Sequence, residues 1–308
     1  MKIKITFLFF VVLCSCKQPM NKKFNDPYIV VLGIAQDAGY PQAGCNKKCC
    51  QEVWEKPEKT EYVSCIGLVD PISNEQWIFD ATPDIKFQIH LLEKQSEIKK
   101  INGIFLTHAH IGHYTGLMHI GKEAMGYSNL PVYCMPRMQN FLKNNAPWDQ
   151  LVNINNINLV ELKNDSFISI NERIKIKPIL VPHRDEYSET VGYLISSNQK
   201  QILYVPDIDK WDRWNISIVD MIKKVDHAFL DATFYADGEL DRDMSKIPHP
   251  FVKESMELFS ELTTDEKNKV NFIHLNHTNP LLIEGSDAKK NVEEKGFNVA
   301  KKMQVFSF

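Results

Sequence analysis

The sequence lacks a strong excess of charge of either sign, a long hydrophobic run and any internal repeat. Its 36 lysines and arginines nearly balance its 39 aspartates and glutamates, which leaves a formal net charge of −3 over 308 residues. Proteins that bind nucleic acid through a basic groove need a strong positive field, so the sequence predicts no nucleic-acid partner. The apolar stretch 5–13 is too short to cross a membrane as a helix, which takes about 20 residues.

The first sixteen residues have the pattern of an export signal. Lys2 and Lys4 precede the apolar stretch, and small residues follow it, as is typical of a secretory signal peptide. Leu13, Ser15 and Cys16, at positions −3, −1 and +1, also resemble the lipobox of bacterial lipoproteins. That resemblance implies cleavage before Cys16 and a lipid on Cys16. A plain secretory signal or an apolar N-terminal strand are the alternatives.

The lipoprotein interpretation divides the chain into three parts. Residues 1–15 are a lipoprotein signal peptide, residues 16–26 a flexible tether and residues 27–308 one folded domain. The protein is then expected to be exported and held on the bacterial cell envelope, in the periplasm or at the surface, with the membrane as a partner through the lipid.

The rest of the chain mixes short buried strands with amphipathic helices. The run 28–34 is apolar and rich in β-branched residues, which predicts a buried strand, and 84–97 places its apolar residues on one helical face. Further strands are predicted at 65–70, 76–79, 104–106, 132–135, 191–196, 201–205, 228–230 and 271–275, and further helices at 115–125, 220–225 and 251–262. This order predicts a layered α/β domain, with an apolar fraction of 44% that is normal for a globular core.

Three histidines lie within six residues, directly after the predicted strand 104–106. They are His108, His110 and His113. Neutral imidazole is a common metal ligand, and a tight loop after a strand lets several rings point at one place. Residues i and i+2 do not share a helix face, so the spacing favours a loop rather than a helix.

Polar residues that can bind a metal recur at the ends of predicted strands. They are Asp80, His108, His183, Asp207 and His274. Each one alone can simply cap a turn, but neighbouring strands that carry such residues at one end can assemble a pocket at that edge of a sheet. The sequence therefore predicts a metal pocket.

A second group of possible ligands lies in a polar loop near the N-terminus. Cys45, Cys49 and Cys50 are close in sequence, and three cysteines cannot all pair with one another, which favours a metal site over disulfides. A disulfide between Cys49 and Cys50 or between Cys45 and Cys50, or free thiols, remain alternatives.

In the order of these elements the chain resembles the metallo-β-lactamase superfamily. The resemblance covers Asp80, the HxHxxH loop and the three later strand-end residues, and it implies an αββα sandwich. It also implies two metal sites that share Asp207 as a bridging carboxylate, with Asp80 supporting the histidine loop from behind. The first site would take His108, His110, His183 and Asp207, and the second His113, Asp207 and His274.

Within that superfamily, three segments are similar to the PQQ-synthesis protein B family. They are 33–42 with the cysteine loop after it, 80–85, and 274–282. The C–P lyase-associated phosphodiesterase shares the cysteine loop, and this resemblance implies a structural zinc on Cys45, Cys49, Cys50 and His277. The adjacent Cys49 and Cys50 depart from the more usual CxCxxC spacing.

Gly112 is the main departure from the superfamily pattern. Most catalytic members have an aspartate at this position, which binds the second metal and orients the nucleophilic water. Asp37, in a glycine-bearing loop, is a candidate to replace that carboxylate; the alternative is a turn aspartate that caps its own backbone. On this interpretation, an aspartate restored at position 112 is expected to strengthen the second site.

Two further polar residues call for an interpretation. Arg184 follows a metal-ligand candidate and can bind an anionic substrate group; alternatively it pairs with Asp185, Glu186 or Asp207 and only holds the loop. His249, between two prolines, is interpreted as a loop residue.

The sequence thus predicts a metal-dependent hydrolase of an ester or phosphodiester, with a small molecule or a peptide as substrate. Asp207, Arg184 and Asp37 are the candidate catalytic residues. Zn²⁺ is the expected metal, and Mn²⁺ or Fe²⁺ are alternatives in the histidine pocket. Resemblance to PQQ-synthesis protein B implies a second possibility, iron-dependent oxidation. A third is a degenerate envelope protein that only binds a metal or ligand.

The lipoprotein hypothesis predicts that Cys16→Ser releases the protein from membranes, because the lipidated side chain is then missing. Fractionation of cells into membrane and soluble material measures this. Persistence of the variant in the membrane fraction would remove the hypothesis.

Overall fold

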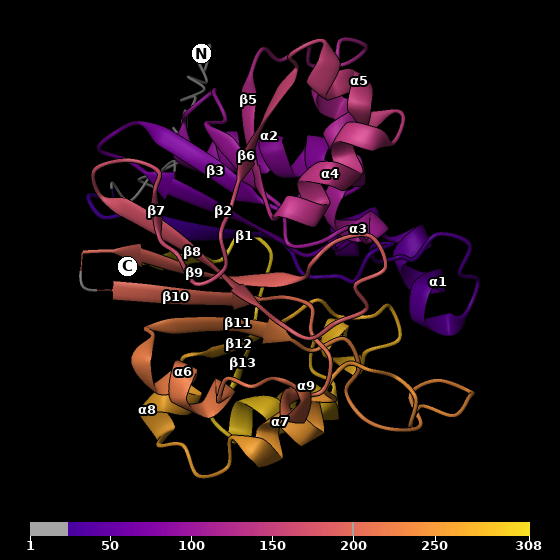
Figure 1. The fold of residues 1–308 in the computed structure, drawn as a ribbon. Coiled ribbons are helices and arrows are strands. Elements are labelled where there is room, and N and C mark those ends of the chain that lie inside the picture. Colours follow the sequence, from indigo (N-terminus) through magenta and orange to yellow (C-terminus); the bar gives the residue numbers. More distant parts are fainter. Residues whose placement is uncertain (1–23, 199) are drawn as a thin grey trace, which may run out of the picture.

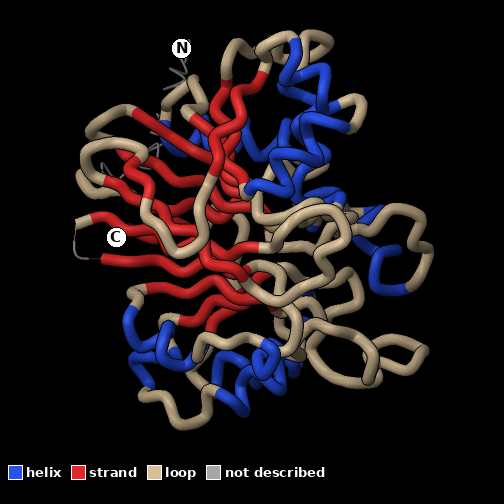
Figure 2. Tube along the Cα trace, viewed as in Figure 1, coloured by secondary structure: helices blue, strands red, loops and turns tan. Residues whose placement is uncertain are grey.

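The computed structural model describes residues 24–198 and 200–308 (Figure 1). Two mixed sheets face each other, and helices cover the outer side of each, so the predicted αββα metallo-β-lactamase sandwich is confirmed (Figure 2). Within the described residues each sheet has seven strands. The predicted signal peptide and Cys16 lie outside the described residues.

The first sheet has the strand order β14-β1-β2-β3-β4-β5-β6. Its strands are β1 (Tyr28–Gly33), β2 (Cys65–Asp70), β3 (Glu75–Phe79), β4 (Gly103–Phe105), β5 (Leu130–Cys134), β6 (Ile157–Glu161) and β14 (Val305–Ser307). Strand β1 is buried along its whole length because alternate residues face different cores: Ile29 packs between the sheets and Val30 packs under the outer helices.

The second sheet has the strand order β13-β12-β11-β10-β9-β8-β7. Its strands are β7 (Ile168–Ser169), β8 (Ile174–Leu180), β9 (Val191–Ser197), β10 (Lys200–Val205), β11 (His227–Asp231), β12 (Val270–Ile273) and β13 (Asn298–Val299). Strands β10, β11 and β12 run parallel to one another, whereas β8, β9 and β10 form an antiparallel meander.

The helices lie in two outer layers and at the edge that carries the loops (Figure 1). Helices α2 (Ile85–Ser96), α4 (Pro136–Asn144) and α5 (Trp148–Asn153) cover the first sheet. Helices α6 (Ile218–Lys224), α7 (Val252–Leu258), α8 (Thr264–Lys267) and α9 (Asp287–Glu294) lie on the side of the second sheet. Helices α1 (Lys48–Glu55) and α3 (Ile111–Tyr114) belong to the loop edge.

The secondary-structure predictions are confirmed for the main strands, and the predicted helices at 84–97, 220–225 and 251–262 correspond to α2, α6 and α7. The predicted helix 115–125 is wrong beyond its first half, because a 3₁₀ turn covers only Thr115–Ile120. Helices α1, α4, α5 and α9 were not predicted. The short segments α1 and α5 offer too few turns for a helical period to stand out from the polar residues around them.

Aromatic rings fill the space between the sheets. Phe79 stacks on Phe105 with ring centroids 4.9 Å apart, and its edge meets Tyr193 of the other sheet at 5.3 Å. All three side chains are fully buried. Asp80 directly follows Phe79, so this packing also fixes the position of Asp80 at the end of the strand.

Strand direction brings the polar loops together. Strands β3 and β4 are parallel. Strand β1 runs in the same direction as β3, because β1 and β3 each pair antiparallel with β2. In the second sheet β8, β10, β11 and β12 likewise share one direction. The two edges are joined directly, since Ala35 forms a parallel bridge with Leu275. The carboxyl ends of strands from both sheets therefore meet at one edge.

The start of the described chain packs on the domain. The Phe24 ring lies 4.5 Å from that of Tyr28, and Arg173 donates a hydrogen bond of 3.1 Å to the carbonyl oxygen of Asn25. The last residues of the predicted tether 16–26 thus contact the fold. Across residues 24–198 and 200–308, no helix is both long and apolar enough to cross a membrane.

The inter-sheet packing predicts a large effect for Phe79→Ala. Removing a fully buried ring leaves a cavity between the sheets and lowers the free energy of unfolding by about 3–5 kcal/mol. Urea unfolding followed by circular dichroism measures it. The control is Ile72→Ala in an exposed turn, expected to change stability by less than about 0.5 kcal/mol. Equal effects of the two variants would contradict this account of the core.

Candidate metal centre

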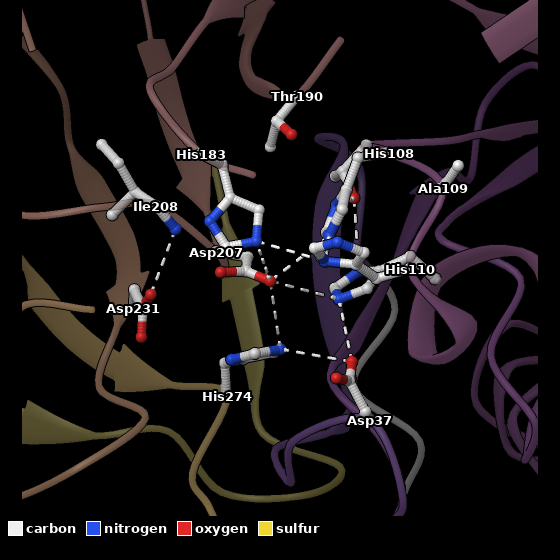
Figure 3. A network of polar contacts seen from close by, with 12 residues as sticks. Asp37, His108, Ala109, His110, His183, Thr190, Asp207, Ile208, Asp231 and His274 are labelled. Atoms are coloured by element: carbon white, nitrogen blue, oxygen red, sulfur yellow. Dashed lines mark hydrogen bonds and ion pairs between the residues drawn. The ribbon is translucent and has the colours of Figure 1, made fainter. Parts of the chain in front are cut away.

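The candidate ligands all follow strands at the shared edge of the two sheets (Figure 3). From the first sheet, Asp37 follows β1 and the histidine loop follows β4. From the second sheet, His183 follows β8, Asp207 follows β10 and His274 follows β12. In Figure 3 these side chains point toward one another around Asp207. Residues up to 237 positions apart in sequence, from Asp37 to His274, thereby line one pocket.

The first cluster consists of His108, His110, His183 and Asp207. The Nδ1 atom of His110 lies 2.9 Å from His108 Nε2 and 3.2 Å from His183 Nε2. The Oδ2 atom of Asp207 lies 3.3 Å from His108 Nε2 and 3.4 Å from His183 Nε2. Tetrahedral ligands about 2.0–2.1 Å from a zinc ion are about 3.3–3.4 Å from one another. The cluster therefore fits a transition-metal ion.

The second cluster consists of Asp37, His113 and His274. Asp37 Oδ1 lies 3.4 Å from His113 Nε2 and 3.9 Å from His274 Nε2. These three atoms are buried and make no hydrogen bond within the described residues. Buried polar atoms are rarely left unpaired, since each costs about 1–3 kcal/mol. Three such atoms facing one point fit a bound cation.

Asp207 belongs to both clusters. Its Oδ2 atom is 3.8 Å from His113 Nε2 and 3.9 Å from His274 Nε2, in addition to its contacts in the first cluster. One carboxylate oxygen thus faces both groups of ligands, which is the place of a bridging ligand.

The rear nitrogen of each ligand histidine has a partner. His113 Nδ1 donates to Asp80 at 2.7 Å, His183 Nδ1 to Asp209 at 3.2 Å and His110 Nε2 to Glu186 at 3.1 Å. Hydroxyls hold the other two: Thr107 contacts His108 Nδ1 and Thr233 contacts His274 Nδ1. A proton held on the rear nitrogen leaves the front nitrogen with a free lone pair, which is the tautomer a metal requires.

Asp80 supports the histidine loop at its base. Its carboxylate accepts hydrogen bonds from the backbone N–H of Thr107 at 2.8 Å and from His113. Asp80 and His274 both adopt left-handed backbone conformations, with φ of 71° and 66°. Such conformations are uncommon for these residues and cluster at functional sites, where the surrounding structure enforces them.

The charges of Asp207, His108 and His274 suit metal binding, whereas, against the effect of burial, Asp80 and Asp37 raise the pKa of His113 well above its usual value. Burial alone would raise the pKa of Asp207, but the imidazoles around it, led by His183 and His249, hold it well below its usual range. Burial lowers the pKa of His108 well below its usual value and also lowers that of His274. A charged carboxylate and neutral imidazoles are the forms that bind a metal ion.

His249 is a loop residue, as predicted, but its side chain lies beside the metal ligands, which the sequence did not reveal. Its ring is buried, Nδ1 donates to Asp231 Oδ2 at 2.8 Å, and the same atom lies 3.3 Å from Asp207 Oδ1. Because Asp231 already takes this proton, the group of Asp207, Asp231 and His249 is paired internally and supports Asp207. Pro248 and Pro250 on either side suggested only a loop, and nothing in the sequence linked His249 to Asp231.

The other supporting residues escaped the sequence analysis although each lies close to a ligand. Asp209 is two residues after Asp207, Thr107 directly precedes His108, and Glu186 is three residues after His183. Nearness in sequence was the available signal. It could not show which of the many neighbouring polar side chains turns back toward the ring.

Arg184 lies on the exposed rim of the pocket. No described carboxylate lies within ion-pair distance of it. Of the partners considered from the sequence, Glu186 contacts His110 and Asp185 accepts a hydrogen bond from Thr190. Arg184 is exposed and forms no close ion pair with these carboxylates, although its charge helps to lower the pKa of Glu186.

The cysteine loop forms a separate cluster with His277. Cys45 Sγ lies 3.9 Å from Cys49 Sγ, and His277 Nδ1 lies 3.5 Å from Cys49 Sγ and 3.3 Å from Cys50 Sγ. Tetrahedral zinc places two thiolates about 3.8 Å apart and a thiolate and an imidazole about 3.6 Å apart. All described cysteines are free, so neither disulfide alternative is present. The four side chains fit a closed structural zinc site.

Two mixed sheets that carry histidine and aspartate clusters at their common edge define the class as a metallo-β-lactamase-fold protein. The chain belongs to the family described as "Beta-lactamase superfamily domain", whose model matches residues 76–275. This segment begins in β3 and runs through His274, so it contains every pocket ligand except Asp37.

Relatives place the chain close to one branch of that superfamily. It is 24% identical to Coenzyme PQQ synthesis protein B of Nitrosococcus oceani, over 88% of this chain and 97% of the relative. Among solved structures, Zn²⁺-bound PqqB from Methylobacterium extorquens matches with a TM-score of 0.76 and 20% identity, over 91% of this chain and all of that one. A diphosphatase of the PhnP family matches with a TM-score of 0.64 and 20% identity, over 92% and 97% of the two chains.

The geometry predicts that His110→Ala empties the first pocket site, because its Nδ1 lies against both of the other imidazoles there. The metal of the cysteine cluster should remain. Elemental analysis of the purified protein measures the loss, and His90→Ala on the exposed face of α2 is the matched control. Full pocket metal in His110→Ala would refute the ligand assignment.

Proposed function

We propose that this protein is a metal-dependent hydrolase of an ester or phosphodiester. The observation that carries the proposal is the position of Asp207 Oδ2, which is within 3.9 Å of imidazole nitrogens from both clusters. Two ligand groups that share one carboxylate can hold two metal ions close together, an arrangement suited to hydrolysing phosphate esters.

The donor set guides the choice of metal. Imidazole and carboxylate ligands suit zinc, manganese and iron, and we propose Zn²⁺ as the first candidate, with Mn²⁺ or Fe²⁺ as alternatives. When bound, the metal would act as a Lewis acid and supply an activated water near neutral pH. The thiolate cluster of Cys45, Cys49, Cys50 and His277 has no open position and is proposed to hold a structural Zn²⁺ only.

Side chains around the pocket have complementary roles in this proposal. Burial lowers the pKa of His249, but Asp231 and Asp207 outweigh it and raise the pKa to about 9. The resulting imidazolium sits beside Asp207 and offsets its charge. Arg184, free on the rim, is positioned to attract an anionic group of the substrate.

A groove lined by the segments around α6 and α7 is a candidate to hold the remainder of a small-molecule or peptide substrate. Its volume is about 380 Å³, and its walls include Trp211, Trp214, Ile216 and Pro250. Its largely apolar walls favour a substrate with an apolar part beside the scissile group.

A second candidate function is iron-dependent oxidation in cofactor biosynthesis. The similarity to PQQ-synthesis protein B along almost the whole chain supports it. The diphosphatase relative supports hydrolysis instead. A single redox-active iron with oxygen uptake would favour oxidation, and a metal-free histidine pocket would favour a protein that only binds a ligand.

We also propose that the protein is exported and anchored to the bacterial envelope by a lipid on Cys16, on the basis of residues 1–16. For the Cys16→Ser fractionation, Cys14→Ser is the matched control because it changes a nearby cysteine and leaves the lipidated residue. The substrate would then be one found outside the cytoplasm.

The hydrolase proposal predicts that the zinc-loaded protein releases nitrophenol from a nitrophenyl ester or a bis(nitrophenyl) phosphodiester. Asp207→Asn should lower kcat by about 100-fold or more, since even the loss of an outer partner of a metal ligand costs about 10–100-fold and Asp207 is itself a proposed ligand. Asp287→Asn, at a fully exposed carboxylate, is the control. No turnover by wild-type protein with full pocket metal would count against hydrolysis.

A further inference from the structure

Gly112 and Asp37 compete for the same space. A Cβ atom built on Gly112 would lie 2.2 Å from Asp37 Oδ1 and 2.6 Å from Asp37 Cα. Contacts this short require the backbone of Asp37 to move, so no side chain fits at position 112 while Asp37 stays in place. Gly112 lies in helix α3 with ordinary helical geometry, so the glycine serves close approach and not an unusual backbone angle.

Among the described residues, no hydrogen bond from the backbone explains the position of the Asp37 carboxylate. It accepts no hydrogen bond from a backbone N–H of the described residues, so the interpretation as a turn aspartate that caps its own backbone does not hold. Its Oδ1 atom instead faces His113 Nε2 and His274 Nε2, and all three atoms are buried without a hydrogen-bond partner among the described residues. A buried carboxylate in this setting calls for a cation.

We propose that Asp37 supplies the carboxylate ligand of the second pocket metal, and that Gly112 has lost its side chain to admit it. The carboxylate that the histidine loop carries in most catalytic members of the superfamily has thus moved to the loop after β1. The second site then consists of Asp37, His113, His274 and the shared Asp207. This inference rests on the metal centre of the proposed function but does not depend on which reaction that centre performs.

The backbone around Asp37 holds it in register with the opposite sheet. Gln36 donates to the carbonyl oxygen of Leu275 at 2.8 Å, and Leu275 donates back to Ile34 at 2.7 Å. Leu275 directly follows His274, so the two candidate ligands are tied together by paired backbone hydrogen bonds. A ligand carried by a fixed backbone loses little conformational freedom when it binds a metal, which favours binding.

The structure overturns the expectation that an aspartate restored at position 112 strengthens the second site. In Gly112→Asp the new side chain collides with Asp37, and the variant should lose second-site metal. Asp37→Gly would not make room for an aspartate at position 112, because the Cα atom of residue 37 would still lie 2.6 Å from a Cβ atom there. The exchange variant, Asp37→Gly with Gly112→Asp, should therefore also lack the second-site metal.

The experiment is a zinc count by elemental analysis together with zinc titration calorimetry on wild type, Asp37→Asn, Gly112→Asp and the exchange variant. Asp37→Asn should lose one equivalent of pocket zinc, or its affinity for that zinc should fall by more than about 10–100-fold. A fall of about 10–100-fold is the penalty for losing only an outer hydrogen-bond partner of a ligand. Gly112→Asp should show the same loss, and the exchange variant should not regain the equivalent, because the contact with the Cα atom of residue 37 remains. Asp287→Asn, a fully exposed carboxylate, should retain all of its zinc.

Thermal unfolding of every variant shows whether the variant is folded. If Asp37→Asn is not folded, Asp37→Ser takes its place in the experiment. Full zinc content and unchanged affinity in Asp37→Asn would overturn the proposal. So would a folded Gly112→Asp variant that retains its full pocket zinc, or a wild type with only one pocket zinc. A wild type that binds both pocket ions without hydrolysing any ester would overturn the proposed function and leave this inference standing.

Discussion

The buried carboxylate of Asp207 requires positive charge around it, and the arrangement of the pocket follows from that requirement. Moving a charged carboxylate out of water costs several kcal/mol unless cations or hydrogen-bond donors compensate it. Here the compensation comes from both sheets: His108 reaches it from the first, and His183 and His249 from the second. The charge of Asp207 is therefore compensated only when the two sheets are packed together.

The loop after β1 has a larger part in this protein than a connecting segment usually has. Its backbone pairs with Leu275, its Asp37 faces the pocket, and its cysteines meet His277. The second pocket site and the cysteine site thus tie the N-terminal loop to the segment after β12. Since these segments are far apart in sequence, closing the loop between them costs conformational entropy, and metal binding offsets part of it.

The sequence predicted the sandwich and most of the pocket because those features are local. A strand ends where an apolar run meets a polar residue, and such junctions marked Asp80, His183 and Asp207 without reference to the rest of the chain. What the sequence left open concerns residues whose role depends on what lies across the pocket. His249 gave no local sign of contact with Asp231, and Arg184 gave no sign that its supposed partners bind elsewhere.

Gly112 and Asp37 separate what the sequence determined from what the tertiary structure decided. The sequence alone determined which residue types can bind a metal, the strand ends that carry them and the absence of a carboxylate at position 112. Only the tertiary structure showed that Asp37 fills the space that a side chain at 112 would occupy. The reason is that ligand spacing along the chain reflects local backbone geometry, whereas exclusion between residues 75 positions apart depends on how β1 and β4 bring their loops together.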